Sequence, residues 1–150
     1  MPGYRTHLGG GLVLGGAALA GLAAADLYRT DLQTGSVLML ATVLGALFPD
    51  TDTDSKGQNL FYAALTVLDL ALIIQRSYQW AAFLGFCALL PAVGRHRGWT
   101  HTWWAMLIVP FPIVLLPALF INAPVQALLP FYAAAALGYF SHLLLDRKFR

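Results

Sequence analysis

Long apolar segments alternate with short polar ones along almost the whole chain. A membrane-spanning helix takes about 20 mostly apolar residues, with a range of roughly 17–25. The candidate spans are Leu8–Ala25, Thr34–Phe48, Asn59–Gln75, Tyr78–Val93, Trp103–Ile121 and Val125–Leu145. The second is short, so we expect a steeply set helix or a partly re-entrant segment there. The pattern predicts an all-α integral membrane bundle of about six spans, forming a single domain over residues 1–150.

The first apolar segment is expected to stay in the protein and not to act as a cleaved signal peptide. Its basic region is the single Arg5, and no clear small-residue cleavage site follows its apolar part. Gly11 and Gly15 form a GxxxG pair of the kind that lets two helices approach closely in lipid. A Gly/Ala-rich helix without a particular partner is equally compatible with this spacing.

The composition excludes an ordinary soluble domain. The chain is 59% hydrophobic and 11% charged, and it contains no glutamate and only two lysines. Soluble domains carry about a quarter charged residues, so little of this surface is suited to water. The net charge of +2 is too small to indicate nucleic-acid binding, and we expect no nucleic-acid partner.

The basic residues are distributed unevenly between the two sides of the predicted bundle. One side collects seven of them, namely Arg5, Lys56, Arg95, Arg97, Arg147, Lys148 and Arg150. The other side has two, Arg29 and Arg76. Because cytoplasmic loops carry an excess of Lys and Arg, both termini are expected in the cytoplasm, with the protein in a bacterial-type cytoplasmic (inner) membrane.

All four histidines and most aspartates fall at this cytoplasmic side, in four polar clusters. The clusters are "THLGG" with His7, "LFPDTDTDS" with Asp50, Asp52 and Asp54, "HRGWTH" with His96, Arg97 and His101, and "GYFSHLLLD" with His142 and Asp146. His142 and Asp146 are four residues apart, so they share one helix face. Residues distant in sequence are therefore predicted to meet at one membrane depth.

Imidazole and carboxylate groups together suit zinc, manganese or ferrous iron. We expect zinc first, with manganese or iron as alternatives, and the expected ligands are His7, Asp50, His96, His142 and Asp146. A hydrolytic zinc site uses three protein ligands and keeps a position for water. The expected ligands are more than one such ion needs, which leaves two arrangements open: two ions, or one ion with separate acid–base and supporting groups.

The remaining polar residues of the clusters are candidates for catalysis. Asp52 or His101 would act as general base or as a ligand of a second ion. Arg97 would hold an anionic group through its guanidinium, although a charge that only sets the topology explains it equally well. Asp54 and Asp69 are assigned no role, and each histidine taken alone is equally compatible with a plain interfacial residue.

The four clusters together resemble the membrane-bound metal-dependent hydrolases of the YdjM type. The matching residues, in order, are Thr6-His7, then Phe48-Pro49-Asp50-Thr51-Asp52 with Ser55, then His96-Arg97-Gly98-Trp99-Thr100-His101, then Gly138-Tyr139-Phe140-Ser141-His142 with Asp146. The departures are Thr102 in place of serine and Phe48 in place of leucine. The resemblance implies a small membrane protein with metal-dependent hydrolase activity, and it names no substrate.

Two functions are compatible with these residues. The first is a hydrolase at the cytoplasmic leaflet, whose partner is membrane lipid and whose substrate is a lipid or lipid-linked phosphoester, because the spans leave no soluble domain to capture a polar substrate. The alternative is a non-catalytic metal-ion binding or transport protein. A transporter needs polar groups through the bundle, and the outer halves of the spans offer little besides Asp69. The sequence leaves the oligomeric state open.

Overall fold

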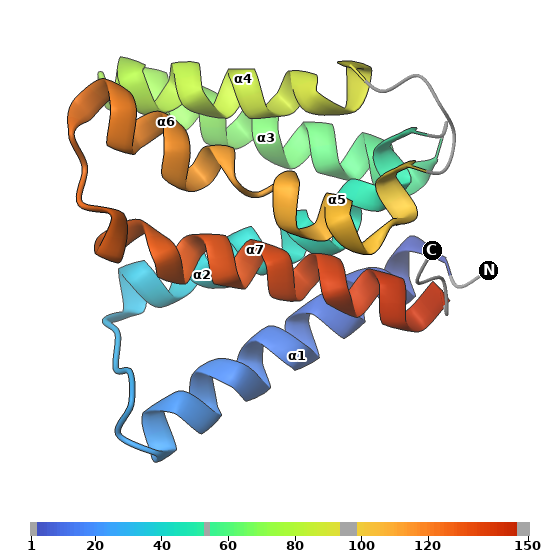
Figure 1. The fold of residues 1–150 in the computed structure, drawn as a ribbon. Coiled ribbons are helices and arrows are strands. Elements are labelled where there is room, and N and C mark those ends of the chain that lie inside the picture. The colour runs from blue at the N-terminus through green and yellow to red at the C-terminus, as the bar shows by residue number, and fades with distance from the viewer. Residues whose placement is uncertain (1–2, 53–54, 94–98, 147–150) are drawn as a thin grey trace.

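The computed structural model describes residues 3–52, 55–93 and 99–146, except for the side chains of Asp52 and of residues 90–93. The described chain is a helical bundle, with both of its ends at the same end of the bundle (Figure 1). We call this the terminal end. The elements in chain order are α1 (Tyr4–Ala24), α2 (Leu32–Leu47), the 3-10 helix η1 (Phe48–Asp52), α3 (Lys56–Ile74), α4 (Tyr78–Val93), the 3-10 helix η2 (Trp99–His101), α5 (Trp103–Ile108), α6 (Pro112–Ile121) and α7 (Val125–Asp146).

The predicted fold class is confirmed. Five helical segments in the described chain are long and apolar enough to cross a membrane, and Tyr78–Leu89 of α4 is a shorter apolar helix. The second segment is longer than expected, because η1 extends α2 to give 20 residues over Leu32–Thr51. A re-entrant segment is therefore not needed to explain it.

The fifth predicted span is not one continuous helix. It is interrupted after Ile108, and α6 begins at Pro112. Pro110 and Pro112 lack the backbone N–H that continues a helix, and their rings clash with the preceding turn. The predicted span over Trp103–Ile121 therefore keeps its bounds but is formed by two helices.

Side-chain caps define where three helices begin. The Asp31 carboxylate accepts hydrogen bonds from the Thr34 backbone N–H (2.9 Å) and hydroxyl (2.8 Å) at the start of α2. These bonds hold the pKa of Asp31 below its ordinary value. Ser55 and Thr102 accept from backbone N–H groups in the same way at the starts of α3 and α5. Such caps satisfy backbone donors that have no partner within the helix.

Small residues bring α1, α2 and α7 into close contact at the terminal end. A Cβ added at Gly11 would lie 2.9 Å from Ala46 Cβ, and one added at Gly15 would lie 3.0 Å from Thr42 Cγ2. A Cβ at Gly138 would overlap the backbone carbonyl of Thr42. The GxxxG pair therefore faces α2 directly, and the reading of α1 as a helix without a particular partner is excluded.

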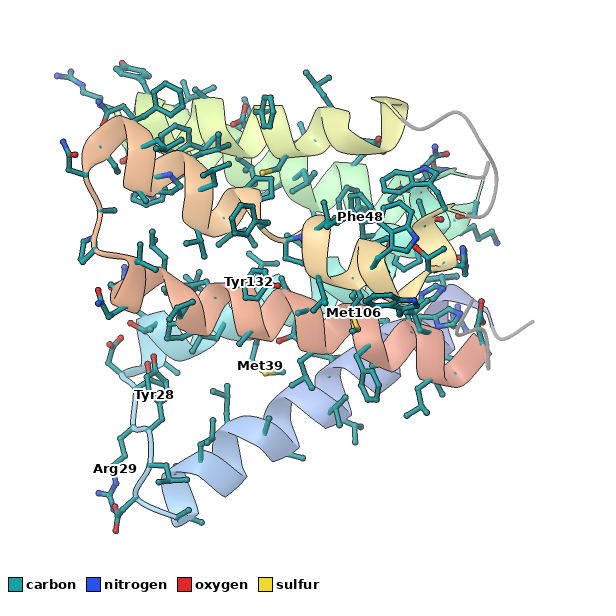
Figure 2. The ribbon with its side chains drawn as sticks, in the orientation of Figure 1. Tyr28, Arg29, Met39, Phe48, Met106 and Tyr132 are labelled. Atoms are coloured by element: carbon teal, nitrogen blue, oxygen red, sulfur yellow. The ribbon has the colours of Figure 1, made fainter. Side chains whose placement is uncertain are left out.

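The protein has a buried apolar core, and much of its outer surface is apolar too. Phe48, Tyr139 and Leu143 belong to the buried core cluster, and Met106 packs against it (Figure 2). Large apolar side chains are widely exposed on the outside, among them Leu32 (88%) and Ile74 (80%). Soluble monomers rarely expose apolar patches on this scale, whereas a lipid-facing surface requires them.

Candidate metal centre

Five of the predicted site residues meet at the terminal end of the bundle. They come from four elements: His7 from α1, Asp50 from η1, His101 from η2, and His142 and Asp146 from α7. His7 was expected just before its span, but α1 begins at Tyr4 and places it inside the first turns of the helix. His7, Gly11 and Gly15 are the buried residues of α1, and their four-residue spacing puts them on one helix face. The face of α1 that packs against α2 therefore also carries His7.

His142 is held in one orientation by the backbone of α2. Its side chain is completely buried, and its Nδ1 lies 2.8 Å from the carbonyl oxygen of Ala46. A carbonyl oxygen only accepts hydrogen bonds, so Nδ1 carries the hydrogen. In the neutral ring, Nε2 then presents a lone pair. A hydrogen bond from the second ring nitrogen to a backbone carbonyl is typical of metal-binding histidines.

The lone pair of His142 Nε2 points into a group of oxygen atoms that also carry lone pairs. Nε2 lies 3.7 Å from Asp50 Oδ1 and 3.6 Å from Asp146 Oδ2, and it has no hydrogen-bond partner among the described residues. Lone pairs facing one another in a buried site repel, and burying polar groups without a partner costs free energy. A cation between these atoms would remove the repulsion and satisfy all of them.

Asp146 stands at the middle of the cluster. Its side chain is 3% exposed, and its two oxygens face different histidines: Oδ1 lies 3.4 Å from His7 Nε2, and Oδ2 lies 3.5 Å from His101 Nε2. Oδ1 is buried and makes no hydrogen bond with the described residues. A buried carboxylate is costly unless it is paired or binds a metal, so this residue too fits a cation site.

The rings of the three histidines are arranged differently around Asp146. His7 and His142 are stacked, with ring centroids 3.8 Å apart and an interplanar angle of 16°. His101 meets His142 edge to face, with centroids 5.3 Å apart. The three rings thus approach the same carboxylate from α1, η2 and α7.

The 3-10 helix η2 is tied to α7 by buried polar contacts. The Tyr139 hydroxyl donates a hydrogen bond to the Thr100 carbonyl oxygen, and both residues are fully buried. The Thr100 hydroxyl lies 3.1 Å from His101 Nδ1. Tyr139 therefore sets the position of η2, and Thr100 helps to orient the His101 ring.

Asp50 lies on the more open side of the cluster. Its side chain is 24% exposed and that of His101 is 16% exposed, whereas His7, His142 and Asp146 are almost completely buried. Ser55 donates a hydrogen bond to the Asp50 backbone carbonyl (3.3 Å) while it caps α3. The turn that carries Asp50 is therefore coupled to the start of α3.

The spacing of the candidate ligand atoms suits a metal ion. Metal–ligand bonds of about 2.0–2.2 Å in a tetrahedral site place ligand atoms about 3.4 Å apart. The four nitrogen–oxygen distances in the cluster are 3.4, 3.5, 3.6 and 3.7 Å, too long for good hydrogen bonds. In two overlapping triads, His7–Asp50–His142 and His101–His142–Asp146, the candidate ligand atoms all lie within 4.8 Å of one another. The nitrogen and oxygen donors match zinc, manganese or iron.

The remaining predicted site residues, and Asp54 and Asp69, to which no role was assigned, are not part of this described geometry. His96, Arg97 and Asp54 lie outside the described residues, and so does the side chain of Asp52. Asp69 lies on α3, five residues before its end at Ile74 and away from the terminal end, and its Oδ1 is buried without a hydrogen-bond partner among the described residues.

Two supporting groups were missed by reasoning from the sequence. Nothing in the sequence indicated a role for the Ala46 carbonyl, because every residue has a backbone carbonyl. Tyr139 was recognised only as part of a motif, without a role. The hydroxyl of Ser141, the residue before His142, donates to the Gly138 carbonyl (2.6 Å) within its own helix.

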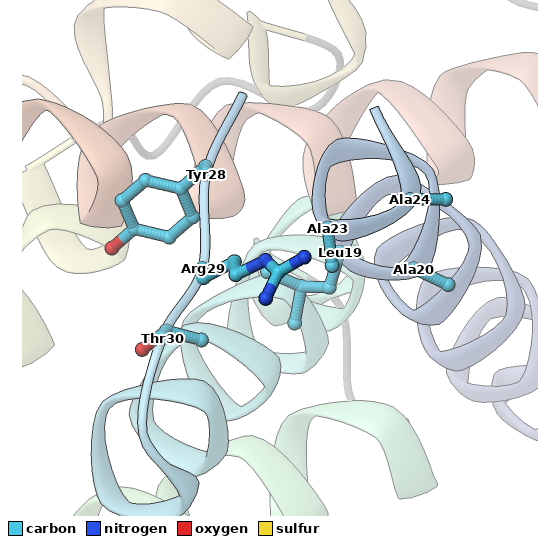
Figure 3. Close-up of a pocket in the computed structure, with 7 residues that line it drawn as sticks. All are labelled: Leu19, Ala20, Ala23, Ala24, Tyr28, Arg29 and Thr30. Atoms are coloured by element: carbon cyan, nitrogen blue, oxygen red, sulfur yellow. The ribbon is translucent and has the colours of Figure 1, made fainter. Parts of the chain in front are cut away.

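A separate pocket opens at the other end of α1 (Figure 3). It is lined by Leu19, Ala20, Ala23 and Ala24 of α1 and by Tyr28, Arg29 and Thr30 of the following loop. Arg29 is highly exposed and forms an ion pair with Asp26 at 2.6 Å. None of the five clustered residues borders this pocket, so it is unrelated to the candidate metal centre.

Comparison with known families agrees with the resemblance of the four motifs. The model of the family described as YdjM inner membrane protein matches residues 1–147. Comparisons with curated proteins and with solved structures gave no match. The chain belongs to the YdjM family and is an integral inner membrane protein, as predicted.

Proposed function

We propose that this member of the YdjM inner membrane protein family is a metal-dependent hydrolase that acts at the cytoplasmic leaflet on a lipid or lipid-linked phosphoester. The observation that carries the proposal is the orientation of His142. Its Nδ1 is bonded to the Ala46 carbonyl, and its Nε2 faces two carboxylates at distances that suit a shared cation. Zinc fits this donor set first, and manganese and iron are alternatives.

Some of the candidate residues would hold the cation, and others would take part in the reaction. His7, Asp50, His142 and Asp146 would hold the cation, which supplies Lewis-acid activation of water and of the scissile ester when bound. His101 borders the more open side and would ligate the cation or accept a proton from the attacking water. Asp52 is the second candidate for the proton, and Arg97, in the segment before η2, would bind the negative charge of the phosphate.

A substrate from the membrane itself is favoured by the position of the centre. Most of the chain is helix that exposes apolar side chains, so a lipid can reach the terminal end by lateral diffusion. The predicted excess of basic residues on the cytoplasmic side would also attract anionic headgroups. The same excess supports a cytoplasmic location of the centre.

The first test is cleavage of defined lipids by detergent-purified protein. Vesicles of phosphatidylcholine would carry a long-chain phosphate monoester, a phosphatidic acid or a polyprenyl diphosphate, and phosphate release would be measured with zinc, manganese or iron added. We expect metal-dependent cleavage of at least one of them by the wild type. Cleavage should be lost in Asp50→Ala and His142→Ala, together with the metal that each of these residues binds.

The matched control is Asp26→Asn, an exposed carboxylate at the opposite end whose left-handed backbone conformation (φ 55°) asparagine tolerates well. It should keep both metal and activity. Full activity of a metal-free Asp50→Ala protein would overturn the proposal, and so would a wild type that binds no metal after reconstitution with each ion.

A metal-ion carrier is the second candidate, and the buried Oδ1 of Asp69 favours it. Ionisable groups within a membrane are costly and mark function by default, and this atom has no hydrogen-bond partner in the described chain. Metal uptake into proteoliposomes that is abolished in Asp69→Ala would favour transport. Uptake equal to that of empty vesicles would exclude it.

A further inference from the structure

We infer that the centre binds two metal ions, with Asp146 as the carboxylate that bridges them. This inference rests on the proposed metal-dependent function and states how many ions the same residues hold. One ion would be bound by His7, Asp50 and Asp146 Oδ1. The other would be bound by His101, His142 and Asp146 Oδ2.

The stacking of His7 on His142 separates their lone pairs. The lone pair of an imidazole nitrogen lies in the ring plane, and these two planes are nearly parallel, with centroids 3.8 Å apart. An ion shared between them would lie about 1.9 Å out of each plane, almost the whole length of a metal–nitrogen bond of about 2.1 Å. The bond to an ion midway between the rings would leave each ring plane by about 65°, far from the direction of the lone pair. Each ring would therefore bind a different ion.

His142 has one nitrogen to offer, although it appears in both metal triads. Its Nδ1 is bonded to the Ala46 carbonyl, and its Nε2 has a single lone pair. It can therefore ligate only one ion. Assigning it to the ion of His101 leaves His7 with Asp50 for the other ion, and each set already contains two protein ligands.

Asp146 has an oxygen facing the histidines of each set. Its Oδ1 faces His7 Nε2 at 3.4 Å, whereas its Oδ2 faces His101 and His142 at 3.5 and 3.6 Å. The two oxygens of one carboxylate thus point to the two histidine groups. Ions in two-metal sites are about 3.5–4 Å apart, and the ring spacing of 3.8 Å falls within that range.

The charges of the described ligands also suit two ions. Asp50 and Asp146 contribute two negative charges when ionised, and the three histidines are neutral as ligands. One divalent ion would only neutralise the carboxylates. Two would leave a net positive charge of two, which attracts an anionic phosphoester and stabilises the charge that develops during its cleavage.

The test is the number of ions bound, measured by elemental analysis on detergent-purified, reconstituted protein after removal of free metal. We expect two equivalents in the wild type, one in His7→Ala and one in His101→Ala, and two in the Asp26→Asn control. Because His101 is near the surface of the centre, His101→Ala still reports on the number of ions if His7→Ala fails to fold.

Electron paramagnetic resonance of manganese-loaded protein gives an independent readout. Two bridged manganese ions should couple and suppress the simple six-line signal of an isolated ion, and that signal should return in His7→Ala. One equivalent in the wild type with an uncoupled signal would overturn the two-ion inference while leaving the proposed function intact. No bound metal in the wild type would overturn both.

Discussion

Replacing Gly138 with alanine should weaken metal binding without altering any ligand. Gly138 lies where α7 crosses α2, one helical turn before His142, so this contact sets how far the imidazole is from the Ala46 carbonyl. An added Cβ would overlap the Thr42 carbonyl and would also lie 3.0 Å from the Ala46 backbone nitrogen, where ordinary contact begins at 3.4 Å. The two helices must therefore move apart.

The size of the effect follows from these distances. Relieving the Ala46 contact alone takes about 0.4 Å, which would stretch the 2.8 Å bond from His142 Nδ1 to about 3.2 Å, the limit for such a bond. The overlap with the Thr42 carbonyl requires more, so the bond should break. Loss of a hydrogen bond that orients a ligand costs about 10–100-fold in metal affinity. Overpacking should also cost about 1–3 kcal/mol of unfolding free energy.

The affinity would be measured by competition with a metal indicator in detergent, beside unfolding of the metal-free protein. Gly16→Ala is the matched control, because a Cβ there meets nothing within 4 Å; it should bind metal like the wild type. If Gly138→Ala also binds with wild-type affinity, the idea that the α2–α7 contact orients His142 is wrong.

Other groups give shorter tests. Tyr139→Phe removes the hydroxyl that donates to the buried Thr100 carbonyl, so we expect a loss of about 0.5–1.5 kcal/mol in unfolding free energy and weaker metal binding; wild-type affinity would contradict the role given to η2. Ser55→Ala removes the cap of α3 and should cost about 0.5–2 kcal/mol in a denaturant titration, with the number of bound ions unchanged. Adding metal at about 100 times its Kd should stabilise the wild type by about 2.7 kcal/mol for each ion bound and should stabilise His142→Ala less; equal thermal shifts would argue against the site. Because the pKa of Asp31 is lowered on folding, its capping contribution is present above its ordinary pKa of 3.8 and is lost as pH falls through the lower folded pKa; an acid titration of Asp31→Asn should lack this step.

Much of the architecture could be predicted from the sequence because helix formation in a membrane depends on local composition. Each apolar segment must satisfy its own backbone hydrogen bonds in lipid, and a helix does so without any partner. The two proline positions, Pro110 and Pro112, show where this reasoning was incomplete. They lie within an apolar segment that hydropathy alone describes as continuous, and the backbone bonds that they remove divide it into α5 and α6.

The sequence could predict which residues gather at the candidate site, but not how their atoms face one another. The sequence identified His7, Asp50, His142 and Asp146 as possible metal ligands at one membrane depth. Both the type of a residue and the predicted side of the membrane follow from the order of residues along the chain. The sequence left the number of ions open, since spacing along a chain does not say which lone pairs point to the same place.

Only the tertiary structure decided how these groups face one another. The glycine contacts between α1, α2 and α7 determine the separation of the helices, and that separation stacks His7 on His142 and brings the Ala46 carbonyl to Nδ1. A backbone carbonyl is present at every residue, so its role has no signature in the sequence. The sequence by itself determined the fold class and the chemistry available at one end of the bundle, whereas the crossing of three helices decided which atoms can share an ion, because distances between helices depend on packing across the whole interface.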